Sequence, residues 1–211
     1  MSALTRSLGA LGAAALVLSL GGCVSLFPKS DPAQLYRFDA AAPSAEQSAG
    51  RPAGQFGVVR GGGSFTRAAS SDRILTVDGG EVAYVANSRW VAPAVTLFDE
   101  ALAQAFDANS GAARLISRGQ TAKADYSLRV DVTRFEAVYD RGPKAAPLVV
   151  VSLRVALTRP DRTPAGSDLI EAQVRAGDNR VSAIVAAFDQ AVGEALNGLV
   201  AWTNRTGAAP A

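Results

Sequence analysis

The chain contains no histidine, and this absence excludes several kinds of chemistry. Without an imidazole, neither a Ser-His-Asp nor a Cys-His catalytic arrangement can form, and the commonest side-chain ligand for metals is missing. Cysteine occurs once, at Cys23, so the chain cannot form an internal disulfide. Catalysis would have to rely on carboxylates, lysine, tyrosine or serine. We therefore expect no catalytic residue, no metal site and no cofactor, and a protein that is not an enzyme.

Neither sign of charge dominates the sequence, which has 21 basic and 19 acidic side chains. Proteins that bind nucleic acid through a basic patch normally carry a clear positive excess, so we expect no nucleic-acid partner. Hydrophobic residues make up 48% of the 211 residues, which excludes a wholly disordered chain. This length and composition fit one domain with terminal segments.

The N-terminus has the three parts of a secretory signal. Arg6 supplies positive charge, residues 8–20 form a 13-residue apolar run, and two glycines precede Cys23. The apolar run is shorter than the roughly 20 residues that a membrane-spanning helix needs. We therefore predict a signal peptide over residues 1–22, cleaved between Gly22 and Cys23.

The residues before Cys23 resemble a bacterial lipobox, with Leu20 at position −3 and two small residues after it. At such a sequence signal peptidase II cuts before the cysteine, and a diacylglycerol is attached to its sulfur. The alternative is an ordinary secreted protein with Cys23 near the cleavage site by chance, but no second thiol exists to pair with it. One acyl chain binds a membrane only reversibly, whereas a mature lipoprotein carries two or three. Val24 at position +2, rather than Asp, favours the outer membrane by the sorting rule of enteric bacteria.

Two segments are predicted to lie outside the folded domain. Residues 23–34 contain Pro28 and Pro32 and are predicted to be a lipidated tether. Ten extended residues reach about 35 Å, which would hold the domain close to its membrane. Residues 204–211 are small and polar, and we predict a disordered tail after a domain that spans residues 35–203.

Alternating apolar residues predict a series of strands. The turn Asp78-Gly79-Gly80 between two such runs is typical of a β-hairpin. Within residues 126–139 the apolar parity switches, which indicates a bulge near Thr133 and Arg134. The expected strands are residues 35–38, 56–60, 74–77, 81–85, 114–117, 126–139, 148–157 and 169–176.

Helical periodicity appears twice, over residues 93–108 and over residues 179–202, where Asp178 is the predicted N-cap. Each helix has one apolar stripe that needs cover. We therefore predict an α/β fold, a two-layer sandwich. Its sheet is mainly antiparallel or mixed, both long helices pack on one face, and the other face is open to water or a partner.

Two motifs that could suggest a phosphate-binding loop or a catalytic carboxylate pair do not support either site. Residues 61–64, Gly-Gly-Gly-Ser, lack the GK[ST] ending of a phosphate-binding loop and are predicted to be an ordinary loop. Asp99 and Glu100 are adjacent on the predicted helix, and neighbouring helical residues do not face each other. We interpret the glycine run as a loop and the two carboxylates as part of a solvated helix face.

The order of these elements resembles the ABC-type transport auxiliary lipoprotein domain, the family of paraquat-inducible protein C. No single stretch of sequence is diagnostic of this family, but the matching stretches together cover nearly the whole mature chain. The stretches that carry the resemblance are Leu35-Tyr36-Arg37-Phe38, Asp72-Arg73-Ile74, Tyr84, Ser88-Arg89-Trp90-Val91-Ala92-Pro93, Ala124-Asp125-Tyr126, Arg134-Phe135-Glu136-Ala137, Ala186-Ala187-Phe188-Asp189 and Val200-Ala201-Trp202. Residues 40–55 and 61–64 have no match in it.

The resemblance implies a role in moving phospholipid or other hydrophobic molecules between the inner and outer membranes. Its expected partners are an MCE-type periplasmic protein and the permease and ATPase of an ABC transporter, with the lipoprotein docking them at the periplasmic face of the outer membrane. It supplies no catalytic residues. A homo-oligomer, a periplasmic lipid carrier with its own cavity, an envelope assembly factor and a hydrolase remain alternatives.

Candidate partner contacts are Arg73, Arg89 and Trp90, together with an edge strand or the open face of the sheet. The alternative for Trp90 and Trp202 is core packing at helix ends. The alternative for the two arginines is a solvated side chain or one paired with a carboxylate.

Overall fold

The computed structural model of the chain describes residues 32–39, 55–116, 119 and 122–209. The chain divides into two units, Met1–Pro32 and Ala33–Ala211, and the second unit is called the body here. The predicted signal peptide, its cleavage site between Gly22 and Cys23, and most of the tether lie outside the described residues.

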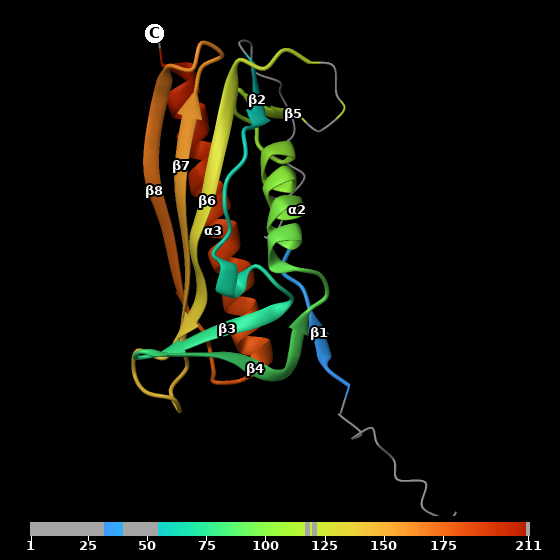
Figure 1. Cartoon of the computed structure of the whole chain (residues 1–211), viewed down its shortest axis with the longest axis vertical. Coiled ribbons are helices and arrows are strands. Elements are labelled where there is room, and N and C mark those ends of the chain that lie inside the picture. The colour runs from blue at the N-terminus through green and yellow to red at the C-terminus, as the bar shows by residue number, and fades with distance from the viewer. Residues whose placement is uncertain (1–31, 40–54, 117–118, 120–121, 210–211) are drawn as a thin grey trace, which may run out of the picture. The chain divides into compact units, whose positions relative to one another are not determined.

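The body is built on one mixed sheet of eight strands in the described residues (Figure 1). Strand β6 is its centre. On one side β6 pairs with β7 along its length, antiparallel; on the other it pairs with β2 near its start and β3 near its end, both parallel. The strands are β1 (Gln34–Tyr36), β2 (Phe56–Arg60), β3 (Arg73–Asp78), β4 (Glu81–Trp90), β5 (Ala113–Ile116), β6 (Tyr126–Val138), β7 (Leu148–Thr158) and β8 (Pro164–Arg175).

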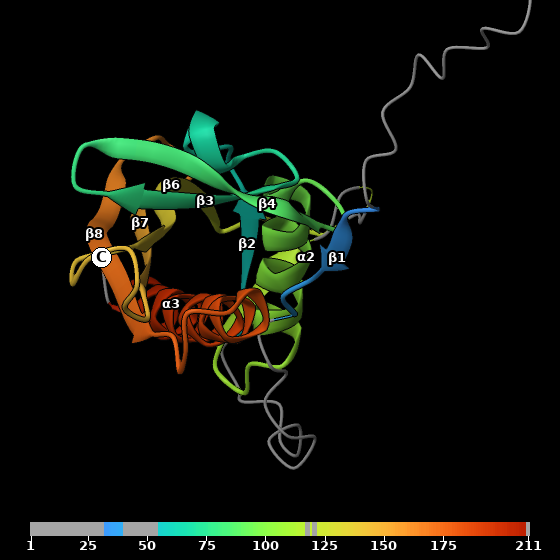
Figure 2. The same cartoon turned by 90° about the horizontal axis from the view of Figure 1, so that it is seen from below.

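Helices α2 (Ala94–Asp107) and α3 (Val181–Ala208) pack on the same face of this sheet (Figure 2). A chain of aromatic contacts shows it. Phe98 of α2 contacts Phe65, Phe65 contacts Phe135 on β6, and Phe135 contacts Phe188 of α3. The predicted α/β fold, with a mixed sheet and two helices on one face, is confirmed.

Helix α3 has the length and composition of a membrane-spanning helix, with 28 residues and a mean hydropathy of 1.2 over its most apolar window. Its apolar stripe is nevertheless occupied, because α3 packs on β7, β8 and α2. Ile184, Phe188 and Leu196 are at most 2% exposed. We therefore assign α3 as the core helix of the body.

Helix α3 begins later than predicted, at Val181, and the predicted N-cap is wrong. Asp178 lies two residues too early, accepting the backbone N–H of Asn179 at 2.6 Å and forming an ion pair with Arg180 at 2.6 Å. Arg180 itself occupies the N-cap position without a side-chain hydrogen bond. The preference for Asp at N-caps identified a side chain that can accept a backbone hydrogen bond. It could not show that this hydrogen bond lies in the turn before the helix.

The other end of α3 also differs, because the helix continues to Ala208. Residues 204–208 of the predicted disordered tail are therefore helical. Asn204 Oδ1 accepts the N–H of Ala113 at 2.8 Å, and the hydroxyl of Tyr126 donates to the carbonyl of Gly207 at 3.0 Å. These contacts with β5 and β6 hold turns whose own sequence has little apolar content.

The local strand signals are confirmed, but two strands are longer than predicted, because β4 continues past residue 85 to Trp90 and β8 begins before residue 169. Gly79 adopts φ +56° in the turn of the β3–β4 hairpin, and the register of β6 against β7 shifts between Val132 and Arg134. Strand β8 begins at Pro164 rather than at 169, because the turn before it is tight and the backbone N–H of Arg159 donates to Thr163 at 2.9 Å.

Residues 61–66, called the glycine segment here, are not a free loop. They continue from β2 along β6: Gly61 N–H donates to the Leu128 carbonyl at 2.8 Å, and Thr66 N–H donates to the Val132 carbonyl at 2.9 Å. Backbone pairing on β6 therefore runs on between β2 and β3. The loop prediction missed this because a run of glycines has no side-chain alternation.

Gly63 is the position in this segment where a side chain is least tolerated. A Cβ there would lie 1.9 Å from the carbonyl oxygen of Val130, and φ is +139°. We expect Gly63→Ala to lower the free energy of unfolding of the mature chain by about 1–3 kcal/mol in urea denaturation. Gly80→Ala is the control, since nothing lies within 4 Å of its added Cβ. Equal stability of the two variants would contradict the close approach.

Candidate partner-contact site

The predicted contact residues Arg73 and Arg89 face each other across the β3–β4 pair. The guanidinium of Arg89 donates to Asp72 at 2.9 Å, and these two side chains are 44% and 40% exposed. The guanidinium carbon of Arg73 lies 5.0 Å from the ring centroid of Tyr84. We call these four residues, Asp72, Arg73, Tyr84 and Arg89, the arginine corner.

The arginine corner carries more positive than negative charge. Asp72 neutralises Arg89, but Arg73 has no carboxylate partner among the described residues and lies only against the face of Tyr84. The hydroxyl of Tyr84 donates to the carbonyl of Ala68 at 3.0 Å, which fixes the ring under the cation. Exposed ion pairs and exposed cation–π contacts each contribute only up to about 1 kcal/mol to stability. The corner is therefore better suited to recognition than to holding the fold together.

Trp90, the third predicted contact residue, lies in the core. It is 2% exposed and makes edge-to-face contacts with Phe38 at 5.1 Å and with Phe188 at 5.4 Å. Successive residues of a strand point to opposite faces, so Arg89 can be exposed while Trp90 is buried. The alternative of core packing is therefore confirmed for Trp90. It is also confirmed for Trp202, because Trp202 is 7% exposed. Trp90 offers no surface to a partner in this arrangement.

A second feature of this region is exposed apolar surface. Val82 on β4 is 61% exposed, Leu35 on β1 is 63% exposed, and Val91 just after β4 is 53% exposed. The sequence predicted the strands but not this exposure. Residues 82–86, Val-Ala-Tyr-Val-Ala, contain no charged side chain, and such a run does not tell a covered strand from an uncovered one.

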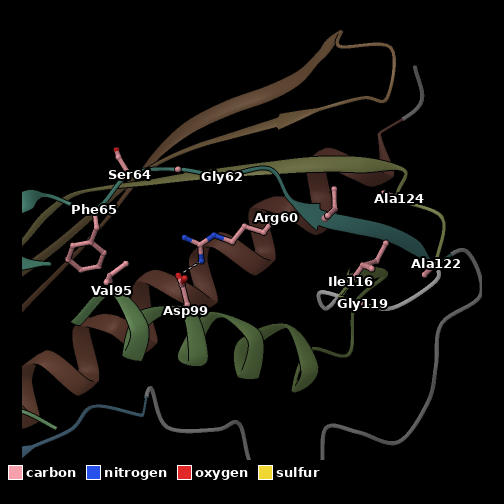
Figure 3. Close-up of a pocket in the computed structure, with 12 residues that line it drawn as sticks. Arg60, Gly62, Ser64, Phe65, Val95, Asp99, Ile116, Gly119, Ala122 and Ala124 are labelled. Atoms are coloured by element: carbon pink, nitrogen blue, oxygen red, sulfur yellow. Dashed lines mark hydrogen bonds and ion pairs between the residues drawn. The ribbon is translucent and has the colours of Figure 1, made fainter. Parts of the chain in front are cut away.

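A hollow with a volume of about 440 Å³ lies between the glycine segment and α2 (Figure 3). Arg60 reaches across it from β2 to form an ion pair with Asp99 on α2. Val59, Phe65 and Val95 add apolar surface, and glycine backbone forms part of the wall. Each charge has its partner within the chain, so the pocket has no free catalytic or ligand-binding group among the residues described.

The outer face of the sheet is held by short ion pairs. Arg129 pairs with Asp131 at 2.7 Å, and Arg134 pairs with Glu136 at 2.8 Å. The predicted open face is smaller than expected. Val150 and Ser152 are 1% and 3% exposed, because their strand neighbours on both sides carry longer side chains. These neighbours are Glu136 and Gln173 for the first, Arg134 and Glu171 for the second. Arg154 remains exposed.

Asp131 connects this outer face to the glycine segment. Besides its contacts with Arg129, its Oδ1 accepts the backbone N–H of Ser64 at 2.8 Å and the Ser64 hydroxyl at 2.7 Å. The hydrogen bond from Arg129, and then that from Ser64, lower the pKa of Asp131 from 3.8 to about 2. The same pair raises the pKa of Arg129.

The lowered pKa of Asp131 makes part of the stability dependent on pH. The stabilisation is present above the ordinary pKa of 3.8 and is lost as the pH falls towards 2, because the unfolded state binds a proton at Asp131 in this range while the hydrogen-bonded carboxylate of the folded state stays ionised. We expect Asp131→Asn to lose about 1 kcal/mol less than the parent between pH 4 and pH 2 in urea denaturation, allowing for solvent screening. Ser64→Ala should raise the pKa of Asp131 in an NMR titration. An unchanged acid limb in Asp131→Asn would contradict this assignment.

The described part of the body presents exposed charged and apolar surface at the arginine corner and beside it. Among the described residues, no group of three or more Cys, Asp or Glu side chains is arranged to hold a metal ion. The arrangement can recognise another molecule by charge and apolar surface.

The family model of the ABC-type transport auxiliary lipoprotein component matches residues 36–199 of the chain. The protein belongs to this family. The matched range runs from the end of β1 into α3 and includes the arginine corner, the glycine segment and the pocket. It begins after Cys23.

Solved structures show the same fold as this ABC-type transport auxiliary lipoprotein. Protein XCC0632 from Xanthomonas campestris, of the DUF330 family, is 25% identical with a TM-score of 0.62, over 83% of this chain and 94% of that chain. DUF330 is the same family. A second crystal structure, of an uncharacterized protein, is 13% identical with a TM-score of 0.61, over 82% of this chain and 99% of that chain. The comparison with curated proteins gives no match.

Proposed function

We propose that this protein is the outer-membrane-anchored, non-catalytic auxiliary component of an MCE-type ABC system that moves phospholipid between the inner and outer membranes. Membership of the auxiliary lipoprotein family is the observation that carries the proposal. The family makes the protein a lipoprotein component of an ABC transport system. The MCE-type partner, the phospholipid substrate and the outer membrane are our extension of it.

In this proposal the molecule works as two parts. Cys23, carrying the acyl chains, fixes the N-terminus in the periplasmic face of the outer membrane. The body binds the MCE-type periplasmic protein, and through it the permease and ATPase, by the arginine corner and the exposed apolar residues beside it. The lack of histidine and the internally paired charges of the pocket support a role in contact rather than in turnover.

A lipid carrier is the second candidate, and the pocket is the feature that bears on it. Acyl chains would have to pack against the Arg60–Asp99 pair, and removing paired charges from water without new partners is costly. The pocket geometry therefore favours the adaptor. If organic extraction of the purified mature chain yielded lipid in stoichiometric amount, beyond the lipid attached at Cys23, the carrier would be favoured instead.

The experiment that tests the adaptor is purification of the tagged full-length chain from its own cells after mild chemical cross-linking. We expect a permease, an ATPase and an MCE-type protein among the cross-linked products, and the tagged chain itself in the outer-membrane fraction of a density gradient. Recovery of the chain without any ABC component, at cross-linking yields that capture known envelope complexes, would refute the proposal.

A further inference from the structure

Strand β4 has an edge that no described residue covers. On one side it pairs with β3, and on the other it pairs with β1 only over Ser88–Trp90. Glu81 to Ala86 therefore have no strand partner on their outer side in the part of the chain that the structure describes. All of them except Val85 are exposed. Uncovered apolar strand edges can accept another strand, and natural proteins usually protect them with charge, proline or a bulge.

The backbone of this edge is arranged to receive a strand. Asp78 and Glu81 flank the two-residue turn as a pair, and regular pairing continues to Tyr84, so the backbone groups of Glu81 and Ala83 point to β3 and those of Val82 and Tyr84 point outward. Two residues with outward N–H and C=O groups offer up to four hydrogen bonds to an added strand.

The chain's own N-terminal strand is poorly suited to cover this edge. Continuing the register of β1, in which Gln34 lies opposite Ser88, would set Pro32 opposite Ala86. Proline has no N–H to donate. Asn87, at φ +50°, also bends β4 where β1 begins its pairing. The described part of the chain thus supplies no strand partner for Glu81 to Ala86 at this edge.

Charge at the edge indicates the chemistry of that chain. Arg73 lies over Tyr84, next to the outward-facing backbone, and has no carboxylate partner among the described residues. Arg67 is exposed on the same turn as Ala68, whose carbonyl accepts the Tyr84 hydroxyl, and it adds further positive charge. In the register that sets Tyr84 opposite Tyr84, antiparallel pairing with a second copy would bring two Tyr84–Arg73 pairs close together, and like charges across a ladder are unfavourable.

We propose that the free edge of β4, Glu81 to Ala86, binds an extended segment of a partner protein as an added strand, with an Asp or Glu of that segment paired to Arg73. Main-chain hydrogen bonds supply the affinity, while Val82, Tyr84 and the cation select alternate side chains of the segment. The inference deepens the proposed function, since it names how the auxiliary component holds its partner, and it rests on that function for the partner's identity.

The test places a photo-cross-linking amino acid at Ala83 of the full-length chain in its own cells, with the same residue at Ser167 on β8 as the control. We expect one adduct from Ala83, which peptide mapping locates to a single acidic segment of another protein, and no such adduct from Ser167. Arg73→Glu should lower its yield about tenfold or more, and Arg73→Lys should keep it. Arg154→Glu, the same charge change on the exposed outer face, should leave it unchanged.

A charge swap guards against a variant that merely misfolds. Changing the mapped acidic residue of the partner to Lys should restore the adduct in the Arg73→Glu chain. An adduct with a second copy, no adduct at Ala83, or a yield indifferent to Arg73→Glu would overturn the inference. If the adduct and the swap behave as expected but the partner belongs to no ABC system, the proposed function fails and the strand site stands. If ABC components co-purify and Ala83 gives no adduct, the strand site fails and the proposed function stands.

Discussion

Replacing Phe135 with alanine should lower the free energy of unfolding by about 3–5 kcal/mol. Phe135 is 1% exposed and lies at the centre of the aromatic cluster, with ring centroids 5.0 Å from Phe188, 5.3 Å from Phe65 and 5.4 Å from Phe38. These rings come from α3, the glycine segment and the residues after β1, so the cavity left by alanine cannot be closed by moving one element. Urea denaturation of the mature chain measures the effect.

Leu169→Ala is the matched control, because Leu169 is an apolar strand residue that is 60% exposed. Its loss should change the free energy of unfolding by less than about 0.5 kcal/mol. A cost below 1 kcal/mol for Phe135→Ala would mean that the sheet and the two helices do not share one core.

Replacing Cys23 with serine should move the protein out of the outer-membrane fraction. The sulfur is the predicted attachment point of two acyl chains, and each buried CH₂ contributes about 0.8 kcal/mol to membrane binding. A serine cannot carry them, so the product should be soluble in the periplasm or retained with its leader uncleaved, with an unchanged fold in the body. Fractionation and intact-mass spectrometry measure both outcomes.

Gly22→Ala is the control for Cys23→Ser, since alanine keeps a small residue before the cysteine. We expect normal processing and membrane attachment in this variant. An unmodified Cys23 in the native protein, or a Cys23→Ser chain that is processed and still fractionates with the outer membrane, would show that the anchor is elsewhere.

The sequence predicted those features whose cause is local. The Asp78-Gly79-Gly80 turn closes the β3–β4 hairpin because its glycines permit the required backbone. The bulge after Val132 was predicted because a parity switch has to occur if both halves of β6 face one core. The burial of α2 follows from its apolar stripe in the same way.

The features that the sequence missed depend on distant residues. The last turns of α3 are helical because Asn204 meets Ala113 and Gly207 meets Tyr126, pairs separated by 91 and 81 residues. The glycine segment is ordered on β6 by backbone bonds that no side-chain pattern reports. Of the candidate contact residues, Arg73 and Arg89 form one exposed corner, while Trp90 turned inward because its strand position faces the core.

These features together describe a contact protein. The core is closed by aromatic packing, the pocket charges satisfy each other, and the arginine corner and the free edge of β4 carry uncommitted groups. An auxiliary component that joins a transport assembly to a membrane needs such a surface and an anchor, and needs no reactive group.

The most direct test of the proposed role is the amount of permease and MCE-type protein recovered with the outer membrane after cross-linking in cells. We predict recovery in cells carrying the native chain, and loss to background both in cells lacking the gene and in cells carrying Cys23→Ser. Equal recovery in all three would contradict the claim that this lipoprotein docks a transport assembly at the outer membrane.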